Sequence, residues 1–265
     1  MVTINARRTP LIAGNWKMNL DHFQAIAFVQ KLDWSLKDAK HDFSAVEVAV
    51  FPPFTDLRSV QTLIAADKLS LAFGAQDVSA QESGAFTGEI SAAFLAKLEC
   101  QYVIIGHSER RTLHNEGDQD VAAKVTAALS HNLVPLICVG ETAEDLEKHG
   151  PSAVPVAQLR AALAGVSNAA DIVVAYEPVW AIGSGKAATP EQAEQVAAAL
   201  RLVLRETLGD DVAEKTRILY GGSVKSGNIA SYMDEPNVDG ALVGGASLDV
   251  AEFGAIVRFQ KHVTA

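Results

Sequence analysis

The chain reads IVVAYEPVWAIGSGKAATPEQ from Ile172 to Gln192, and this stretch combines a strand, a carboxylate and a helix start. Ile172–Tyr176 is a continuous apolar run, which is typical of a strand buried on both faces of a parallel sheet. Glu177 follows at once, and Pro178 biases it away from helix. Residues 189–192, Thr-Pro-Glu-Gln, predict the next helix, with Thr as N-cap, Pro at the first position and Gln at the third. The stretch is therefore one strand–loop–helix unit, with a carboxylate at the carboxyl end of its strand.

Similar units run along the whole chain. Eight short apolar runs predict strands: Leu11–Gly14, Val46–Phe51, Leu71–Ala75, Tyr102–Ile105, Val134–Val139, Ile172–Tyr176, Ile218–Tyr220 and Gly240–Val243. Segments between them, such as 121–129 and 196–204, repeat apolar residues at helical spacing. A doubly wound open sheet is the alternative, but eight nearly even units of roughly 33 residues favour a closed parallel (β/α)₈ barrel. Because no linker interrupts the pattern, residues 1–265 are expected to form a single domain.

Composition excludes several classes of protein. Hydrophobic residues make up 49% of the 265 residues, and no apolar run is near the length of about 18 needed to span a membrane. The formal net charge of −10 opposes a nucleic-acid role, which requires a basic face. The two cysteines, Cys100 and Cys138, form no pairing motif and indicate reduced thiols in a cytoplasmic protein.

Unusual polar and glycine residues follow the predicted strands: Asn15, Lys17, His107, Glu177, Gly221-Gly222-Ser223 and Gly244-Gly245. In a parallel barrel all these strand ends open on one face, where barrel active sites lie. The sequence therefore predicts that these residues converge, although they are far apart along the chain.

The chemistry of these residues suits proton abstraction. Glu177 is a candidate base, and the apolar residues that follow it suggest a loop that closes over a ligand. Lys17 would steady negative charge on a substrate or on a developing oxyanion. His107 precedes a predicted helical turn, and a helix N-terminus is expected to lower its pKa and keep it a neutral hydrogen-bond donor.

Two glycine turns, after the seventh and eighth strands, form the recurring phosphate site of barrels. Residues 183–186, Gly-Ser-Gly-Lys, do not fit a nucleotide-binding loop, because the upstream glycine is absent and no Ser or Thr follows the lysine. No histidine pair, cysteine cluster or aspartate array predicts a metal site. The expected chemistry is thus cofactor-free and acts on a small phosphorylated substrate.

Five motifs together resemble the triosephosphate isomerase family: GNWKMN (14–19), IIGHSERR (104–111), AYEPVWAIGSGK (175–186), YGGSV (220–224) and ALVGGASL (241–248). The resemblance covers essentially the whole chain in order. It implies an isomerase of glycolysis and gluconeogenesis that interconverts D-glyceraldehyde 3-phosphate and dihydroxyacetone phosphate through an enediolate.

The resemblance also implies catalytic roles. Glu177 is then the general base that moves a proton between C1 and C2 of the triose phosphate, and neutral His107 polarises the substrate carbonyl. Lys17 and Asn15 contact the same oxygens. Glu109 is similar to the family's supporting carboxylate near Lys17, although pairing with Arg110 or Arg111 explains it equally well from sequence alone.

The resemblance further implies that backbone N–H groups bind the phosphate. These groups belong to Gly183, Ser223 and Gly245, and Gly244 shapes the turn. Residues 178–188 would be the lid, whose closure excludes water.

The segment 76–89 after the third strand is long enough to be a lid, a binding loop or a disordered loop. In the family it inserts into a neighbouring subunit, and the residue matching Thr87 approaches the partner's active site. The resemblance therefore implies a homodimer.

Three residues depart from the common family pattern: Asp77, Ser184 and Lys225. They leave interface strength and lid kinetics open. Two other functions also stay open at this point, a different phosphosugar aldose–ketose isomerase barrel and a non-catalytic phosphosugar-binding relative. The isomerase alternative need not carry Lys17, His107 and Glu177 together. A non-catalytic relative is expected to have lost the base or the cation, and both are present.

Overall fold

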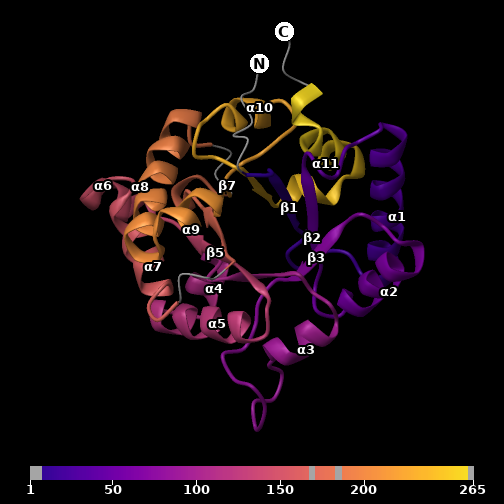
Figure 1. Cartoon of the computed structure of the whole chain (residues 1–265), viewed down its shortest axis with the longest axis horizontal. Helices are drawn as coiled ribbons and strands as arrows, with labels where there is room; N and C mark the ends of the chain where they lie inside the picture. The colour runs from indigo at the N-terminus through magenta and orange to yellow at the C-terminus, as the bar shows by residue number, and fades with distance from the viewer. Residues whose placement is uncertain (1–7, 167–170, 183–186, 262–265) are drawn as a thin grey trace.

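Eight parallel strands close into a barrel in sequence order, β1-β2-β3-β4-β5-β6-β7-β8, with β8 paired to β1 (Figure 1). The computed structural model describes residues 8–166, 171–182 and 187–261. The strands are β1 (Leu11–Asn15), β2 (Glu47–Phe51), β3 (Ala72–Ala75), β4 (Tyr102–Ile105), β5 (Val134–Val139), β6 (Val173–Tyr176), β7 (Arg217–Tyr220) and β8 (Gly240–Val243). Each predicted strand is confirmed to within one residue at either end.

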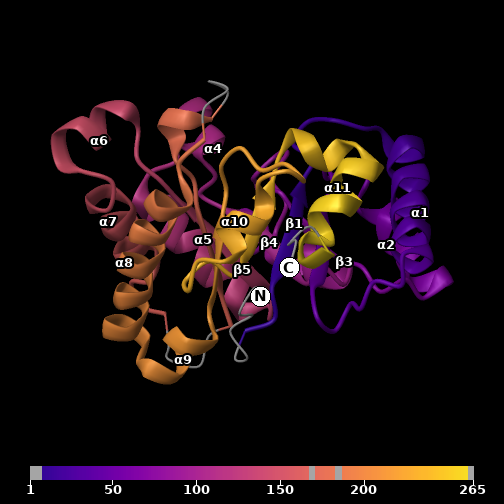
Figure 2. The ribbon, with the colours of Figure 1, turned by 90° about the horizontal axis from the view of Figure 1, so that it is seen from above.

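Helices surround the barrel (Figures 1 and 2). They are α1 (His22–Asp38), α2 (Leu57–Asp67), α3 (Ala92–Lys97), α4 (Ser108–Leu113), α5 (Asp118–Ser130), α6 (Ala143–His149), α7 (Ala153–Ala162), α8 (Pro190–Leu208), α9 (Asp210–Lys215), α10 (Ile229–Met233) and α11 (Val250–Val257). Short 3₁₀ turns are η1 (Val179–Ala181), η2 (Gly245–Leu248) and η3 (Phe259–Lys261). In both views α1, α2 and α11 lie on one side of the barrel and α6, α7 and α8 on the opposite side.

Helix α8 begins as the sequence predicts. Thr189 is the N-cap, its side chain accepts a hydrogen bond from the N–H of Gln192, and Pro190 occupies the first turn. The Gln192 side chain in turn accepts from the N–H of Thr189 at 2.9 Å. This reciprocal capping box fixes the point at which the loop after β6 ends.

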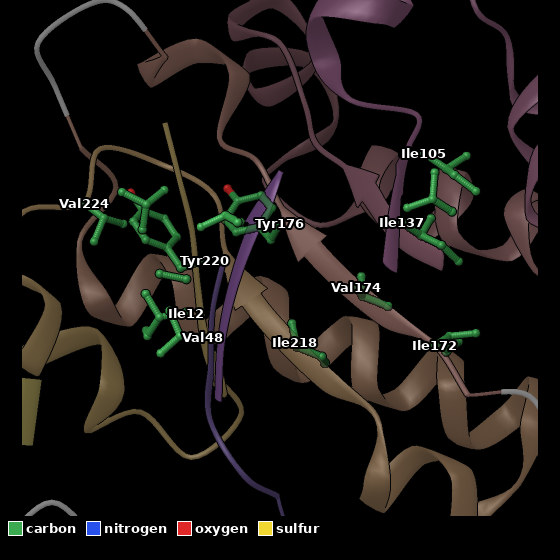
Figure 3. Packing of buried hydrophobic residues seen from close by; sticks show 14 of the residues in the cluster. Ile12, Val48, Ile105, Ile137, Ile172, Val174, Tyr176, Ile218, Tyr220 and Val224 are labelled. Carbon is green, nitrogen blue, oxygen red and sulfur yellow. The ribbon is translucent and has the colours of Figure 1, made fainter. Parts of the chain in front are cut away.

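The core has two layers, because successive residues of a strand point to opposite faces. Ile12 and Val174 belong to the layer between strands and helices, part of which Figure 3 shows. Ala13, Cys138 and Ala175 belong to a second cluster that fills the barrel interior. The continuous apolar pattern of the strands thus follows from burial on both faces.

Buried ion pairs occupy the amino-terminal end of the barrel. Asp239, directly before β8, accepts from Arg8 Nε at 2.6 Å, from Arg201 Nη2 at 2.7 Å and from the N–H of Ile218 at 3.0 Å. At the same end Tyr102 donates to Glu47 at 2.6 Å. These contacts connect elements from the two ends of the chain.

The segment 76–89 between β3 and α3 projects from the barrel, below α3 in Figure 1. Its base is closed by the N–H of Ser79, which donates to the carbonyl of Ile90 at 2.8 Å. Within the described residues, no helix combines the length and apolar character needed to cross a membrane.

Candidate active site

A cavity of about 420 Å³ opens at the carboxyl ends of the strands. It is lined by Asn15, Lys17, His107, Glu109, Glu177, Ile182, Gly221, Gly222, Ser223, Val224, Lys225, Leu242, Gly244, Gly245 and Ala246. The structure therefore brings together every described residue that the sequence assigned to catalysis or phosphate binding. Thr87 lies apart from this cavity, and Gly183 lies outside the described residues.

Glu177 is held at the cavity wall by the backbone around it. Its N–H donates to the carbonyl of Val139 at 2.8 Å. Gly140 must lack a side chain, because a Cβ there would lie 1.9 Å from the carbonyl oxygen of Glu177. The carboxylate, only 2% exposed, accepts from the N–H of Ser108 at 3.0 Å and from its hydroxyl at 3.3 Å. The backbone and the carboxylate of this residue are thus fixed by the end of β5 and the start of α4.

His107 is the N-cap residue of α4 and contacts Glu177. Its Nδ1 accepts from the N–H of Glu109 at 3.2 Å, and its Nε2 lies 3.0 Å from Glu177 Oε1. Since Nδ1 is an acceptor, the ring proton of the neutral form belongs on Nε2. His107 therefore directs an N–H donor toward Glu177 and the cavity.

The contact between these two residues sets their pKa values. Burial alone raises the pKa of Glu177, but His107, the N–H of Ser108 and Lys17 together lower it. Burial lowers the pKa of His107, yet the Glu177 carboxylate, aided by Glu109, raises it overall. The predicted lowering of the His107 pKa is therefore wrong for this arrangement, because a carboxylate 3.0 Å away favours the protonated ring.

Lys17 is held in an uncommon backbone conformation. Its φ is +54°, and its N–H donates to Asn15 Oδ1 at 3.0 Å. Gln76 Nε2 donates to the carbonyl of Lys17 at 2.7 Å and to that of Phe51 at 2.8 Å. The lysine is thus positioned by a side chain at the end of β1 and by one that follows β3, which is consistent with a demand on its location.

Glu109 forms an ion pair with the ammonium of Lys17. Arg110 instead pairs with Glu116, with Nε 2.6 Å from Oε1, and Arg111 pairs with Asp118 at 2.7 Å. Of the two interpretations of Glu109, the geometry favours the one implied by the family resemblance.

The two glycine turns add bare backbone to the lining of the cavity. A Cβ on Gly245 would meet no atom within 4 Å, so this backbone faces open space. A Cβ on Gly222 would lie 2.1 Å from the hydroxyl of Tyr220. Gly244 packs beside Lys17, whose Cε would lie 3.5 Å from an added Cβ. Open backbone beside a lysine suits an anion such as phosphate, which backbone N–H groups can bind.

The described parts of the loop after β6 are anchored at both ends. Trp180 Nε1 and the Tyr176 hydroxyl both donate to Glu141 Oε1, at 2.7 and 2.8 Å. At the far end the N–H of Ala188 donates to the Tyr220 hydroxyl at 3.2 Å. These contacts tie the loop to the strands on either side of β6.

Three residues of this arrangement were missed by the sequence analysis: Ser108, Glu141 and Gln76. Glu141 follows the buried strand β5 almost as Glu177 follows β6, so the same pattern could have identified it. Ser108 adjoins His107 and had no separate signal. Gln76 directly follows β3, but its role depends on the φ of Lys17, which no sequence pattern specifies.

Comparison with known proteins places the chain in a family. The sequence model of the triosephosphate isomerase family matches residues 10–260. A triosephosphate isomerase of Leifsonia xyli subsp. xyli is 79% identical over 257 residues, covering 97% of this chain and 99% of that protein. Those of Streptomyces avermitilis and Corynebacterium glutamicum are 55% and 57% identical, covering 96% and 94% of this chain and 98% and 96% of their own lengths. The chain belongs to the triosephosphate isomerase family.

Proposed function

We propose that this protein interconverts D-glyceraldehyde 3-phosphate and dihydroxyacetone phosphate, in glycolysis and gluconeogenesis, with Glu177 as the general base. Family membership makes the chain an isomerase. The observation that carries the assignment is the cavity itself, in which a carboxylate, a histidine, a lysine and two glycine turns from five different strand ends meet.

Glu177 would take the proton from one carbon of the triose and return it to the next. Its lowered pKa keeps the carboxylate ionised at neutral pH, as a base requires. The carboxylate contacts Ser108 and His107, so it must turn into the cavity to reach a substrate carbon. The hydrogen bonds to Ser108 hold it ionised until then.

His107 would polarise the carbonyl that accepts negative charge. When Glu177 turns toward the substrate, Nε2–H loses its partner and can donate to a substrate oxygen. The larger of the two influences that raise the pKa of His107 leaves with the Glu177 carboxylate, while that of Glu109 stays. Burial and the N–H of Glu109 at Nδ1 then favour the neutral ring, which can pass its proton between the two oxygens of the enediolate.

Lys17 and Asn15 would stabilise the same oxygens. Asn15 Oδ1 is occupied by the N–H of Lys17, which leaves the amide N–H₂ as a donor at the cavity. The N–H groups of Ser223 and Gly245, with Gly183 from the lid, would bind the phosphate. Residues 178–188 would close over the substrate and exclude water.

The first test is turnover of the two triose phosphates by purified protein, with a chelator present. Fast interconversion that the chelator does not affect supports the assignment and its independence of metal. A folded protein without turnover would leave the two alternatives, a different phosphosugar isomerase or a phosphosugar-binding protein, which a ligand panel separates.

Substituting His107 is expected to shift the acid limb of the kcat/KM profile. His107 is among the causes that lower the pKa of Glu177, so in His107→Asn that pKa rises. A carboxyl group whose pKa is lower in the folded than in the unfolded state stabilises the fold at pH values above its unfolded pKa. This stability is lost as the pH falls through the folded pKa. The variant should therefore lose both activity and its acid stability at a higher pH than the wild type.

The measurement is kcat/KM and thermal unfolding from pH 7 down to about pH 4. His131→Asn is the control, because its ring pairs with Glu82 on the surface. An acid limb that does not move in His107→Asn contradicts the coupling.

We further propose a homodimer built through the segment 76–89. Large apolar side chains are exposed after consecutive strands: Met18 (94%) after β1, Phe54 (37%) after β2, Phe86 (45%) after β3 and Leu113 (73%) on α4. Since β1 to β4 are neighbours, these side chains gather on one side of the molecule. An exposed apolar surface of this kind is typical of a protein–protein interface, and Thr87 lies on it beside Phe86.

A charge in this surface is expected to separate the dimer. Phe86→Glu should yield a monomer by light scattering, because a buried carboxylate without a partner opposes association. Activity should fall with dissociation, since Met18 adjoins Lys17 at the same surface. Trp34→Glu, at a side chain 78% exposed on α1, is the control and should leave the dimer intact. A dimeric Phe86→Glu variant would contradict this interface.

A cytoplasmic location and a single-domain organisation of residues 1–265 complete the proposal. Both cysteines are buried, and burial raises the pKa of Cys100 to about 12, which suits thiols that remain reduced.

A further inference from the structure

We propose that Lys225 attracts the anionic phosphate of the substrate to the cavity and raises the rate of productive encounter. The inference rests on the proposed function, because it assumes a phosphorylated substrate. It assigns Lys225 no part in the proton transfer.

The backbone holds Lys225 close to Ser223, whose N–H is one of the proposed phosphate donors. Its N–H donates to Asn228 Oδ1 at 2.8 Å, and Asn228 Nδ2 donates to the carbonyl of Ser223 at 3.0 Å. The carbonyl of Lys225 accepts from the N–H of Ile229 at 3.0 Å. This turn fixes the origin of an exposed side chain that lines the cavity two residues after Ser223.

Lys225 determines the net charge of the cavity lining. Four charged side chains line it among the described residues: Lys17, Glu109, Glu177 and Lys225. Lys17 is paired with Glu109, whereas among the described ion pairs none involves Lys225. Two cations and two carboxylates sum to zero, and removing Lys225 would leave the site with a net charge of −1.

The net charge of the cavity affects binding because the phosphorylated ligand and the protein are both anionic. The chain carries a formal net charge of −10, and a phosphate monoester carries up to two negative charges at neutral pH. A cation about 10 Å from a dianion in water contributes an attraction that corresponds to about two- to five-fold in encounter rate at low ionic strength. Salt weakens it, since the screening length falls to about 3 Å at 1 M.

The test compares wild type with Lys225→Gln and Lys225→Glu. The matched control is Lys215→Gln, which removes the same charge from an exposed lysine before β7, at the opposite end of that strand. At low ionic strength we expect kcat/KM to be about two- to five-fold lower in Lys225→Gln than in the wild type. In Lys225→Glu the reduction should be roughly the square of that factor. The kcat should stay within about two-fold, and the difference in kcat/KM should shrink at about 0.5 M salt.

Two further measurements separate attraction from a structural effect. Turnover of D-glyceraldehyde, which lacks the phosphate, should not change in Lys225→Gln. Inorganic phosphate should bind more weakly to this variant than to the Lys215→Gln protein. A loss of kcat/KM that persists at high salt, or that extends to glyceraldehyde, overturns the proposal.

Failure of the proposed function is distinguishable from failure of this inference. If the wild type turns over no triose phosphate, the proposed function is wrong, while inorganic phosphate still reports on Lys225. Weaker phosphate binding by Lys225→Gln then supports the attraction, and equal binding by all variants overturns it.

Discussion

Glu177→Gln should lower kcat by about 10²- to 10⁴-fold while the protein stays folded. The amide keeps the size of the carboxylate and an oxygen that can accept from the N–H of Ser108, so the local structure is retained. It has no basic oxygen to take a proton from carbon. Loss of turnover with unchanged circular dichroism is therefore the expected result, measured in both directions of the isomerisation.

The control for this experiment is Glu147→Gln, which removes an exposed carboxylate on α6 and should leave kcat unchanged. Retention of wild-type turnover by the Glu177 variant would sink the proposed mechanism. Exchange of the substrate's carbon-bound hydrogen with solvent should disappear in parallel, which identifies the proton transfer itself as the affected step.

Asp239→Ala is expected to cause the largest loss of stability. The carboxylate is 4% exposed and accepts from Arg8, Arg201 and the N–H of Ile218. Its removal leaves two buried guanidinium groups without their shared partner, a change that typically costs about 3–5 kcal/mol. For a chain of this size we expect a fall in melting temperature of roughly 6–20 °C.

Thermal and denaturant unfolding measure this effect, and Asp210→Ala provides the matched comparison. Asp210 pairs with Arg205 at 2.8 Å, but its side chain is 80% exposed, so that variant should melt within about 2 °C of wild type. Equal melting temperatures for the two variants would show that the buried network contributes nothing beyond a surface pair.

The sequence predicted the barrel because its signals were local. Each strand was visible as an apolar run such as Val134–Val139, and the capping residues Thr189 and Pro190 gave the start of α8. Convergence of Lys17, His107 and Glu177 then followed from a general property of parallel barrels. The geometry agrees with that expectation.

Contacts across the barrel could not be predicted in the same way. The pKa of His107 depends on where Glu177 points, and the φ of Lys17 depends on Gln76, which lies 59 residues away. Such properties arise from distances between side chains on different loops, and periodicity carries no information about them. The family resemblance supplied the pairing of Glu109 with Lys17, which the local pattern left undecided.

The two ends of the barrel have different roles, one in stability and the other in catalysis. Asp239 and its arginines lie before the strands, whereas Glu177 and its partners lie after them, with the packed interior between. Selection for growth at a new temperature can therefore change residues at the amino-terminal ends of the strands and leave the catalytic groups at the carboxyl ends unaltered. In a directed-evolution library, substitutions that raise heat tolerance without changing turnover should accumulate around the strand beginnings.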